Sequence, residues 1–449
     1  MRIVPQKISE GRPTEESERW IFLETNCIFR TFHSMLSKSQ SQIIRSMDPV
    51  VQVIAAAGSG KTRTVVELVE TRLRQGAARP GRVLMLSFSR KACAEIRSRL
   101  SQAARESVKV STFHALAFEW MRKKRAFSIV TDAEKERFLS KMLLARGTGG
   151  VPVSVLLRNK RAFFEHMPRL CFDAHRAFAC YKRERGALEF DDLVRGLLCG
   201  LETGEFEELK TAYDLVIVDE FQDTDKEQLQ FLRLLKPAQL VVVGDDYQSI
   251  YAFRGSNPEI FLNFSRYFKG LKRFFLMENY RSYKEITDCG NRIILHARDR
   301  LKKRVVSVRG SRALPASVIS LRPGEEQSMV PALDAGAVVL CRTNYRRFSW
   351  LRAGAPADRV LTIHASKGLE FPSVFLDVTG GYSSLRGVQR VPDEEVRVSY
   401  VGLTRAENFL CLLYDPLAGE REPERMIFEM FRPHVERLSH AQAIELCEA

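Results

Sequence analysis

The stretch AAAGSGKT, Ala55 to Thr62, decides the fold. It follows an apolar run typical of a buried strand, Val50–Ala55, and it precedes an amphipathic helical pattern. A glycine-rich loop between a strand and a helix is the arrangement of a P-loop, although the first position is alanine here rather than glycine. Because glycine lets backbone N–H groups approach phosphates closely, we predict a phosphate-binding loop over Ala57, Gly58, Ser59 and Gly60.

Two further groups complete this nucleotide site in the sequence. Lys61 would reach the β- and γ-phosphates, and Thr62 would offer its hydroxyl to Mg²⁺. The run LVIVDEFQD ends a second apolar strand in two acids, of which Asp219 would hold Mg²⁺ and Glu220 would orient and deprotonate the attacking water. Two solvated acids at a strand end are the plainer alternative, which a neighbouring P-loop disfavours. We therefore predict ATP and Mg²⁺ as cofactors.

Apolar runs alternate with helical patterns along the whole chain. Near-continuous apolar strands suit a parallel sheet buried on both faces, and strands alternating with helices imply right-handed βαβ units. Four runs precede residue 245 and four follow residue 335, which predicts an α/β fold with two halves. The runs are Val50–Ala55, Val83–Phe88, Leu215–Val218, Leu240–Val243, Val338–Cys341, Val360–Ile363, Val374–Val378 and Phe409–Leu413.

Composition narrows the class of protein. The 449 residues include 70 Lys plus Arg and 55 Asp plus Glu, so the formal net charge of +15 weakly favours a polyanionic partner. No run approaches the roughly 18 to 20 apolar residues of a membrane helix, so we expect no membrane partner. The nine cysteines contain no Cys-x-x-Cys pair, which indicates reduced thiols in a cytoplasmic protein rather than a disulfide framework or a zinc site.

Further motifs follow one another in a set order. A third strand leads into GDDYQSIYAFRG, Gly244 to Gly255, where Gln248 would sense the γ-phosphate. Together these motifs resemble those of superfamily 1 helicases of the UvrD/Rep type, from about Leu36 to Leu413. The others are LSKSQ (36–40), SFSRKACAEIRSRL (87–100), STFHALA (111–117), LEFDDL (188–193), ENYRS (278–282), VVLCRTN (338–344), LTIHASKGLEF (361–371) and VSYVGLTRAEN (398–408).

The resemblance implies two RecA-like parallel-sheet domains of a P-loop NTPase, with a helical insertion in the first. We therefore expect an N-terminal extension over 1–34 and a first RecA-like ATP-binding domain over 35–114 and 187–275. The basic, helical stretch 115–186 would be the insertion, similar to subdomain 1B of the family. Residues 276–449 would form the second RecA-like domain.

The resemblance also implies roles around the nucleotide base and sugar. Gln40 would read adenine, although Ser37 stands in that motif where asparagine is usual. Arg63 and Tyr280 would sandwich the adenine ring, and Glu370 would contact the ribose.

Two arginines of the second half would be catalytic by the same resemblance. Arg281 and Arg405 would act as arginine fingers on the γ-phosphate, beside Lys61, Glu220 and Gln248. A cation from the second half completes charge neutralisation only when the halves close, which would link hydrolysis to domain motion. Ordinary salt bridging on a helix surface is the plainer alternative for both arginines.

A track for a single nucleic-acid strand is implied in the same way. Stacking on aromatic rings beside a basic groove is how strands are bound without sequence preference, although buried aromatic residues usually form core. Phe253 replaces the tryptophan usual in the family. The expected stacking rings are Phe88, Phe113, Phe190, Tyr251 and Phe253, and the further expected contacts are Thr112, His114, Arg254, Arg342 and His364.

One departure from the family pattern concerns its 2B subdomain. UvrD/Rep proteins carry a large helical insertion between the RTN strand and motif V, whereas only Tyr345–Arg359 lies there in this chain. Below about 40 residues a free-standing domain generally needs staples, so we predict that 2B is absent.

The resemblance implies an ATP-dependent DNA helicase that moves 3′ to 5′ on single-stranded DNA and separates the strands of 3′-tailed duplexes. Two alternatives stay open: a translocase that strips proteins or powers a complex without unwinding alone, and a nucleotide-gated binding module. RNA as substrate and the biological pathway, including repair and replication, also stay open. We expect a monomer in isolation, with residues 1–34 or the C-terminal tail after about Asp415 available to a protein partner.

Overall fold

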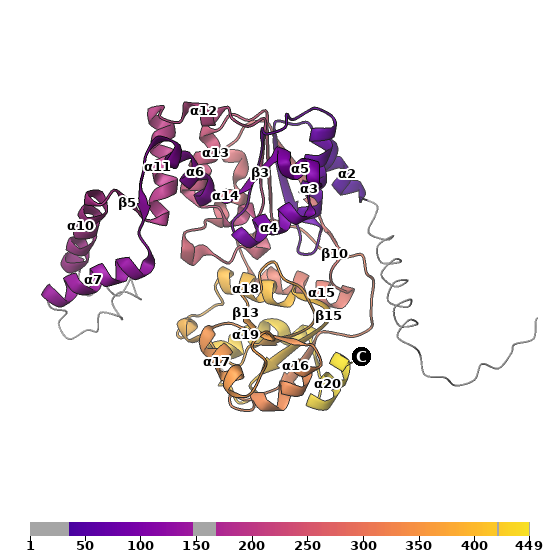
Figure 1. Ribbon diagram of the computed structural model, residues 1–449. Helices are drawn as coiled ribbons and strands as arrows, with labels where there is room; N and C mark the ends of the chain where they lie inside the picture. The colour runs from indigo at the N-terminus through magenta and orange to yellow at the C-terminus, as the bar shows by residue number, and fades with distance from the viewer. Residues whose placement is uncertain (1–35, 147–167, 420–421, 449) are drawn as a thin grey trace, which may run out of the picture.

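The computed structural model describes residues 36–146, 168–419 and 422–448. Figure 1 shows two α/β lobes, one above the other, with a helical arm that projects from the upper, first lobe. Each lobe contains a six-stranded sheet whose strands all pair in parallel. The prediction of two parallel-sheet domains is confirmed. Within the described ranges, no helix combines the length and the apolarity needed to span a membrane.

The P-loop strand, β1 (Val50–Ala55), lies one strand in from an edge of the first sheet. Alternate residues of this strand, β1, face opposite sides: Val51 and Val53 pack with helix α3 (Lys61–Arg74), and Ile54 packs with α11 (Phe190–Thr203). The sheet is therefore covered on both faces, as parallel sheets are. The strand order is β3 (Val108–Ser111), β2 (Val83–Leu86), β6 (Leu215–Val218), β7 (Gln239–Gly244), β1 (Val50–Ala55) and β8 (Leu271–Leu276).

The second sheet includes the C-terminal residues of the chain. Helix α19 (Pro423–Phe431) buries Ile427 and Phe431 in this lobe, and the last strand pairs with β11. The tail beyond Asp415 is therefore part of the second lobe. The strand order is β13 (Val360–Thr362), β12 (Val338–Cys341), β14 (Phe371–Asp377), β15 (Ala406–Tyr414), β11 (Ser317–Ser320) and β16 (Glu436–Arg437).

The helical insertion begins later than residue 115. Helix α6 (Phe113–Lys124) packs Leu116 and Met121 into the core of the first lobe beside α11, so it belongs to that lobe. The arm in Figure 1 starts beyond α6, at a short parallel pair of strands, and its outer part contains two helices packed against each other. The elements of its described part are β4 (Ser128–Ile129), α7 (Asp132–Arg146), α10 (Pro168–Glu184) and β5 (Ala187–Leu188).

Residues 147–167 of the predicted insertion lie outside the described residues, and so does the predicted extension 1–34. Among the described side chains of the arm, Phe138, Phe178 and Tyr181 form an aromatic cluster with ring centroids 4.6–5.9 Å apart. This small cluster is separate from the two lobe cores.

In the second lobe, α17 (Asn344–Arg352) is followed directly by β13, through the short connection 353–359. The helix packs onto its own lobe through Trp350, which is fully buried and donates from Nε1 to Asp377 Oδ2 at 2.7 Å. Arg346 of the same helix pairs with that carboxylate and with Glu326. A buried ionic network therefore fixes α17 beside the end of β14.

Removal of the central acid of this network should destabilise the second lobe. Asp377→Ala leaves the indole N–H of Trp350 without its acceptor and the buried Arg346 with Glu326 alone, and loss of one partner from a buried ion pair costs about 3–5 kcal/mol. Urea denaturation followed by circular dichroism checks this. Asp358→Ala is the matched control, because its side chain is 79% exposed and should change stability by less than about 0.5 kcal/mol. Equal unfolding midpoints for both variants would contradict the role of the network.

Candidate active site between the two lobes

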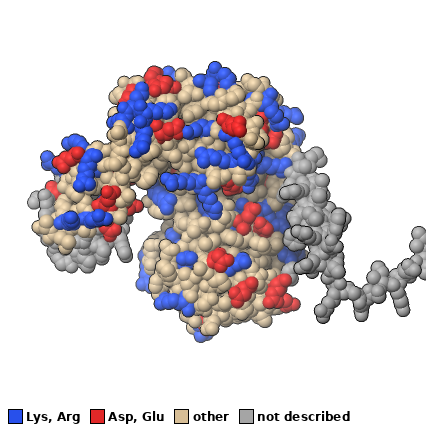
Figure 2. Space-filling view, viewed as in Figure 1, with Lys and Arg blue, Asp and Glu red and all other residues tan. Residues whose placement is uncertain are grey.

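A cleft of about 920 Å³ lies between the lobes. Its first-lobe wall consists of the loop after β1 and the ends of β2, β6 and β7, and its second-lobe wall includes Lys367–Glu370 and Arg405. Lys and Arg side chains border the hollow where the lobes meet (Figure 2). The carboxyl ends of several parallel strands thus open into one crevice, which is where open α/β sheets bind ligands.

The P-loop has the backbone that its glycines predict. Gly58 and Gly60 have φ of 65° and 75°, in the left-handed region that favours glycine. A Cβ at Gly58 would lie 2.7 Å from the Cβ of Arg281, so the loop also needs glycine there to let the second lobe approach. Helix α3 begins at Lys61, so its first N–H groups and its positive dipole end face the cleft. These are the features of an anion site.

Two acidic residues, Asp219 and Glu220, directly follow β6 and line the floor of the cleft. Glu220 has φ 54° and ψ 39°, a strained conformation for a residue with a side chain, and its Oε2 accepts from Gln222 Nε2 at 2.6 Å. Burial and the adjacent Glu220 raise the pKa of Asp219 to about 7. Burial alone would raise the pKa of Glu220 too, but the charges of Lys61 and Lys367 outweigh it and hold that pKa below its usual value. Glu220 is therefore the acid that keeps its negative charge.

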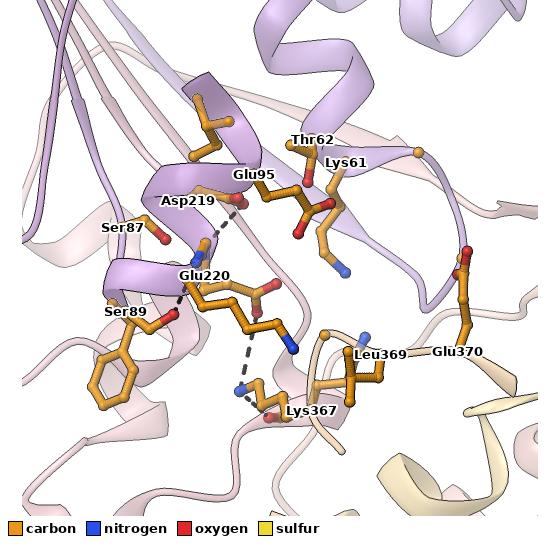
Figure 3. A pocket seen from close by; sticks show the side chains of 18 of the residues that line it. Lys61, Thr62, Ser87, Ser89, Glu95, Asp219, Glu220, Lys367, Leu369 and Glu370 are labelled. Carbon is orange, nitrogen blue, oxygen red and sulfur yellow. Dashed lines mark hydrogen bonds and ion pairs between the residues drawn. The ribbon is translucent and has the colours of Figure 1, made fainter. Parts of the chain in front are cut away.

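The donor set at this floor fits Mg²⁺. Thr62 and Asp219 both line the cleft and offer hard oxygen ligands (Figure 3). Asp219 is 5% exposed, and a divalent ion would stabilise the charged form of such a buried carboxylate. In the described part of the chain, no cluster of three or more His, Cys, Asp or Glu side chains forms a complete metal cage. Mg²⁺ usually binds one or two carboxylates together with substrate phosphates.

The second lobe contributes both predicted arginines. Arg405 is 1% exposed and donates from Nη2 to Gln248 Oε1 at 3.0 Å and from Nη1 to Leu369 O at 3.1 Å. Burial and the nearby Arg281 lower the pKa of Arg405 to about 9. Arg281 pairs with Glu370 at 2.7 Å, so that this predicted ribose contact is an ion-pair partner here. The structure thus brings Gln248 and Arg405 together across the cleft.

Lys367 also reaches across the cleft and was not singled out from the sequence. Its ammonium donates to the Asp223 carboxylate and to Gln248 O at 2.8 Å, and it lies 4.0 Å from Glu220 Oε2. Figure 3 shows it pointing from the second lobe toward Glu220. Burial raises the pKa of Asp223 to about 6, against the lowering effect of this lysine. Lys367 could have been found from its place within the motif LTIHASKGLEF, which also contains the predicted His364 and Glu370.

The residues expected at the adenine ring lie on the same cleft. Gln40, Arg63 and Tyr280 all line it. Gln40 is held by a reciprocal cap at the start of α2 (Lys38–Arg45): its Oε1 accepts from Ser37 N at 3.0 Å, and its N donates to Ser37 Oγ at 3.2 Å. Serine therefore performs the capping role in this motif.

A row of rings crosses from the first lobe to the second. Phe88 stacks on Tyr251 with centroids 5.0 Å apart, and Tyr251 lies 6.0 Å from Phe253. Phe253 is 64% exposed and meets the ring of His364, from the second lobe, at 5.4 Å. The Arg254 guanidinium lies 5.2 Å from the Tyr251 ring. We call these five residues the aromatic row.

A second exposed ring lies nearer the helical arm. Phe190 is 52% exposed, and its centroid lies 6.5 Å from that of His114. Thr112 accepts from Ala115 N and caps α6.

Two residues that were expected to contact a nucleic-acid strand contact other protein side chains instead. Phe113 is 6% exposed and packs edge-on against Phe231, so this ring belongs to the core and is not available for stacking on a strand. Its position at the start of an amphipathic helix explains this, since that face of α6 turns toward the sheet. Arg342 makes a bidentate ion pair with Glu395, at 2.6 and 2.8 Å.

Two parallel-sheet lobes around a P-loop and an acidic strand end define a two-domain protein of the P-loop NTPase class. Residues 36–146 and 156–269, about half of the chain, match the UvrD/REP helicase N-terminal domain, and residues 356–415 match the UvrD-like helicase C-terminal domain. The chain therefore belongs to the UvrD/REP helicase family.

Two relatives illustrate the extent of the similarity. The "ATP-dependent DNA helicase PcrA" of Staphylococcus epidermidis is 29% identical over 300 aligned positions, gaps included, and the match covers 60% of this chain and 41% of PcrA. The "Probable DNA helicase" of Mycoplasma pneumoniae is 26% identical over 469 aligned positions, gaps included, and the match covers 89% of this chain and 88% of that protein. The match thus spans well under half of PcrA but most of the mycoplasma protein.

Substitution of one P-loop glycine should weaken nucleotide binding. Gly58→Ala adds a Cβ at φ 65°, 2.7 Å from Arg281 Cβ, so the loop must shift and we expect ATP affinity to fall at least about tenfold. Titration with a fluorescent ATP analogue measures this. Gly76→Ala is the matched control, since its φ is 67° but nothing lies within 4 Å of the added atom. Equal affinities for the two variants would show that this loop does not hold the phosphates.

Proposed function

We propose that this protein is an ATP-dependent DNA helicase, a motor that hydrolyses ATP and moves 3′ to 5′ along single-stranded DNA. One observation carries the proposal: a single loop after β7 contributes residues both to the nucleotide cleft and to the aromatic row. Gln248 of this loop contacts Arg405 in the cleft, while Tyr251 and Phe253, three and five residues later, belong to the aromatic row. A change at the nucleotide therefore has a short, buried route to the DNA track.

Each charged group of the cleft has a role in hydrolysis under this proposal. Lys61 and the N–H groups at the start of α3 hold the phosphates, and Mg²⁺, when bound, neutralises part of their charge through Thr62 and Asp219. Glu220, with its lowered pKa, accepts the proton of the attacking water. Lys367 and Arg405 bring positive charge from the second lobe, and cations in a dry cleft stabilise the charge that develops on the γ-phosphate.

Movement follows from the two-lobed geometry of the aromatic row. Phe253 belongs to the first lobe and His364 to the second, so closure of the cleft changes the spacing between rings on which bases stack. Each base stacked on an aromatic ring contributes about 1–3 kcal/mol without regard to sequence. One cycle of closure and opening would then move the strand by one stacking position. The direction, the strand separation and the use of 3′-tailed duplexes rest on the family resemblance.

A second candidate is a translocase that displaces proteins from DNA without unwinding alone. The short connection 353–359 favours it, because we propose that no 2B-like subdomain occurs between α17 and β13. The two candidates differ in output. A strand-displacement assay on a 3′-tailed duplex, run beside displacement of streptavidin from biotinylated DNA, separates them: activity in the second assay alone supports the translocase.

Steady-state ATP hydrolysis with and without single-stranded DNA tests the proposed function. We expect strong stimulation by DNA in the wild type. Glu220→Gln should lower turnover about 10²- to 10⁴-fold, because it removes the base while keeping the shape of the side chain. Glu227→Gln, a partly exposed acid paired with Arg195, is the control and should retain wild-type turnover. Full turnover in Glu220→Gln would refute the site, and stimulation by RNA alone would change the substrate.

The exposed ring of the aromatic row should matter for DNA and not for ATP. Phe253→Ala should weaken binding to a labelled oligothymidylate by about 1–3 kcal/mol in fluorescence anisotropy, with unchanged ATP affinity. Phe348→Ala is the control, because Phe348 is also exposed, at 57%, but lies on α17 outside the row. If both variants bind DNA as the wild type does, the row is not the DNA track.

A further inference from the structure

A buried lysine sits where the two lobes join, outside the residues assigned so far. Lys303 precedes β10 (Val306–Ser307), and its side chain is 1% exposed. Its ammonium donates to three oxygens of the first lobe: Ala55 O at 3.0 Å, Asp245 Oδ1 at 2.6 Å and Asp246 Oδ1 at 2.7 Å. One cation thus joins the base of the P-loop to the loop after β7.

The backbone around this lysine is fixed to the same loop. The Tyr247 hydroxyl lies within donor range of two carbonyl oxygens, Leu301 O at 2.9 Å and Lys303 O at 3.1 Å, and Leu301 N donates to Asp246 Oδ2 at 2.8 Å. The ammonium also lies 4.1 Å from the centroid of the Tyr247 ring. The position of Lys303 is therefore determined independently of its contact with Asp245.

Asp245 connects the lysine to the catalytic groups in two directions. Its Oδ2 accepts from Gln248 Nε2 at 2.5 Å, and its backbone N donates to Gln222 Oε1 at 2.9 Å. Gln222 in turn donates to Glu220, and Gln248 Oε1 accepts from Arg405. Glu220 is thus two contacts away from the backbone N of Asp245, and Arg405 is two contacts away from its carboxylate.

The charge state of that carboxylate decides which way the Gln248 amide points. An ionised carboxylate only accepts hydrogen bonds, so it binds the NH₂ end of the amide and leaves the oxygen for Arg405. A protonated Asp245 could donate to the amide oxygen, and the NH₂ end would then face the guanidinium, which only donates. Asp245 is fully buried, and burial would raise its pKa, but the charges of Lys303 and Lys61 and the hydrogen bonds from Gln248 and Lys303 together hold the pKa below its usual value.

We propose that Lys303 is a positioning residue for ATP hydrolysis: through Asp245 it fixes the Gln248 amide with its oxygen toward Arg405. This role rests on the proposed function. It assigns to the segment between α15 (Lys284–Ile293) and β10 a part in aligning the arginine of the second lobe with the chemistry in the first.

Steady-state kinetics at saturating single-stranded DNA test the proposal. Lys303→Met should lower kcat about 10- to 100-fold, the usual loss when a partner that orients an active group is removed, with little change in the KM for ATP. Lys302→Met is the matched control: it removes the same charge from the neighbouring lysine, which is exposed, so kcat should stay at the wild-type value. Wild-type kcat in Lys303→Met would overturn the proposal.

A double variant separates positioning from folding. Lys303→Met leaves two buried carboxylates without their cation, so its unfolding midpoint is measured with its kcat. Lys303→Met combined with Asp245→Asn removes one of those charges and should recover stability. Its kcat should stay low, because an asparagine amide can both donate and accept and does not specify the Gln248 orientation. Recovery of kcat together with stability would overturn the positioning role.

The wild type distinguishes this proposal from the proposed function. If the wild type does not hydrolyse ATP with DNA present, the proposed function fails and the role of Lys303 fails with it. If the wild type hydrolyses ATP and Lys303→Met does so equally well, only the positioning role fails.

Discussion

Burial of charge at the seam between the lobes is the constraint on which the rest of the structure depends. Three buried cations bind partners on the first lobe: Lys367 and Arg405 of the second lobe, and Lys303 where the two lobes join. A buried ion without its partner costs several kcal/mol, so these contacts hold the lobes in register more specifically than apolar packing could. They also place positive charge where phosphate oxygens would bind, so the requirements of folding and of chemistry coincide.

The loop between β7 and Tyr251 concentrates this dependence. Asp245, Asp246, Tyr247 and Gln248 are all at most 4% exposed: the two acids share Lys303, Tyr247 contacts Leu301 and Gln248 contacts Arg405. A loop with so little freedom cannot move one residue without displacing the others, because protein interiors are packed as densely as crystals. The distance between the nucleotide cleft and the aromatic row is thus covered by a rigid piece of chain.

The sequence predicted those strands and functional groups that can be recognised from their immediate neighbours in the chain. β1, β6 and β7 are continuous apolar runs and were predicted, whereas β3 (VKVS) and β8 (LKRFFL) carry Lys or Arg on their exposed positions and were not. The contact between Gln248 and Arg405 was anticipated only through the family resemblance. Lys303 was missed because a lysine in a basic stretch predicts a surface position, and its burial depends on carboxylates that lie 57 and 58 residues away in the chain. Phe113 is the opposite case: its place in a family motif predicted a ring exposed to nucleic acid, but the ring is buried in the core.

The left-handed backbone of Glu220 has an evolutionary consequence. A residue with a Cβ pays about 1–2 kcal/mol for that conformation, which glycine adopts freely. Random substitution toward glycine at this position would therefore stabilise the fold while it removed the carboxylate. Only selection for turnover opposes that drift, so copies of the gene freed from such selection should lose glutamate here before they lose the hydrophobic strand that precedes it.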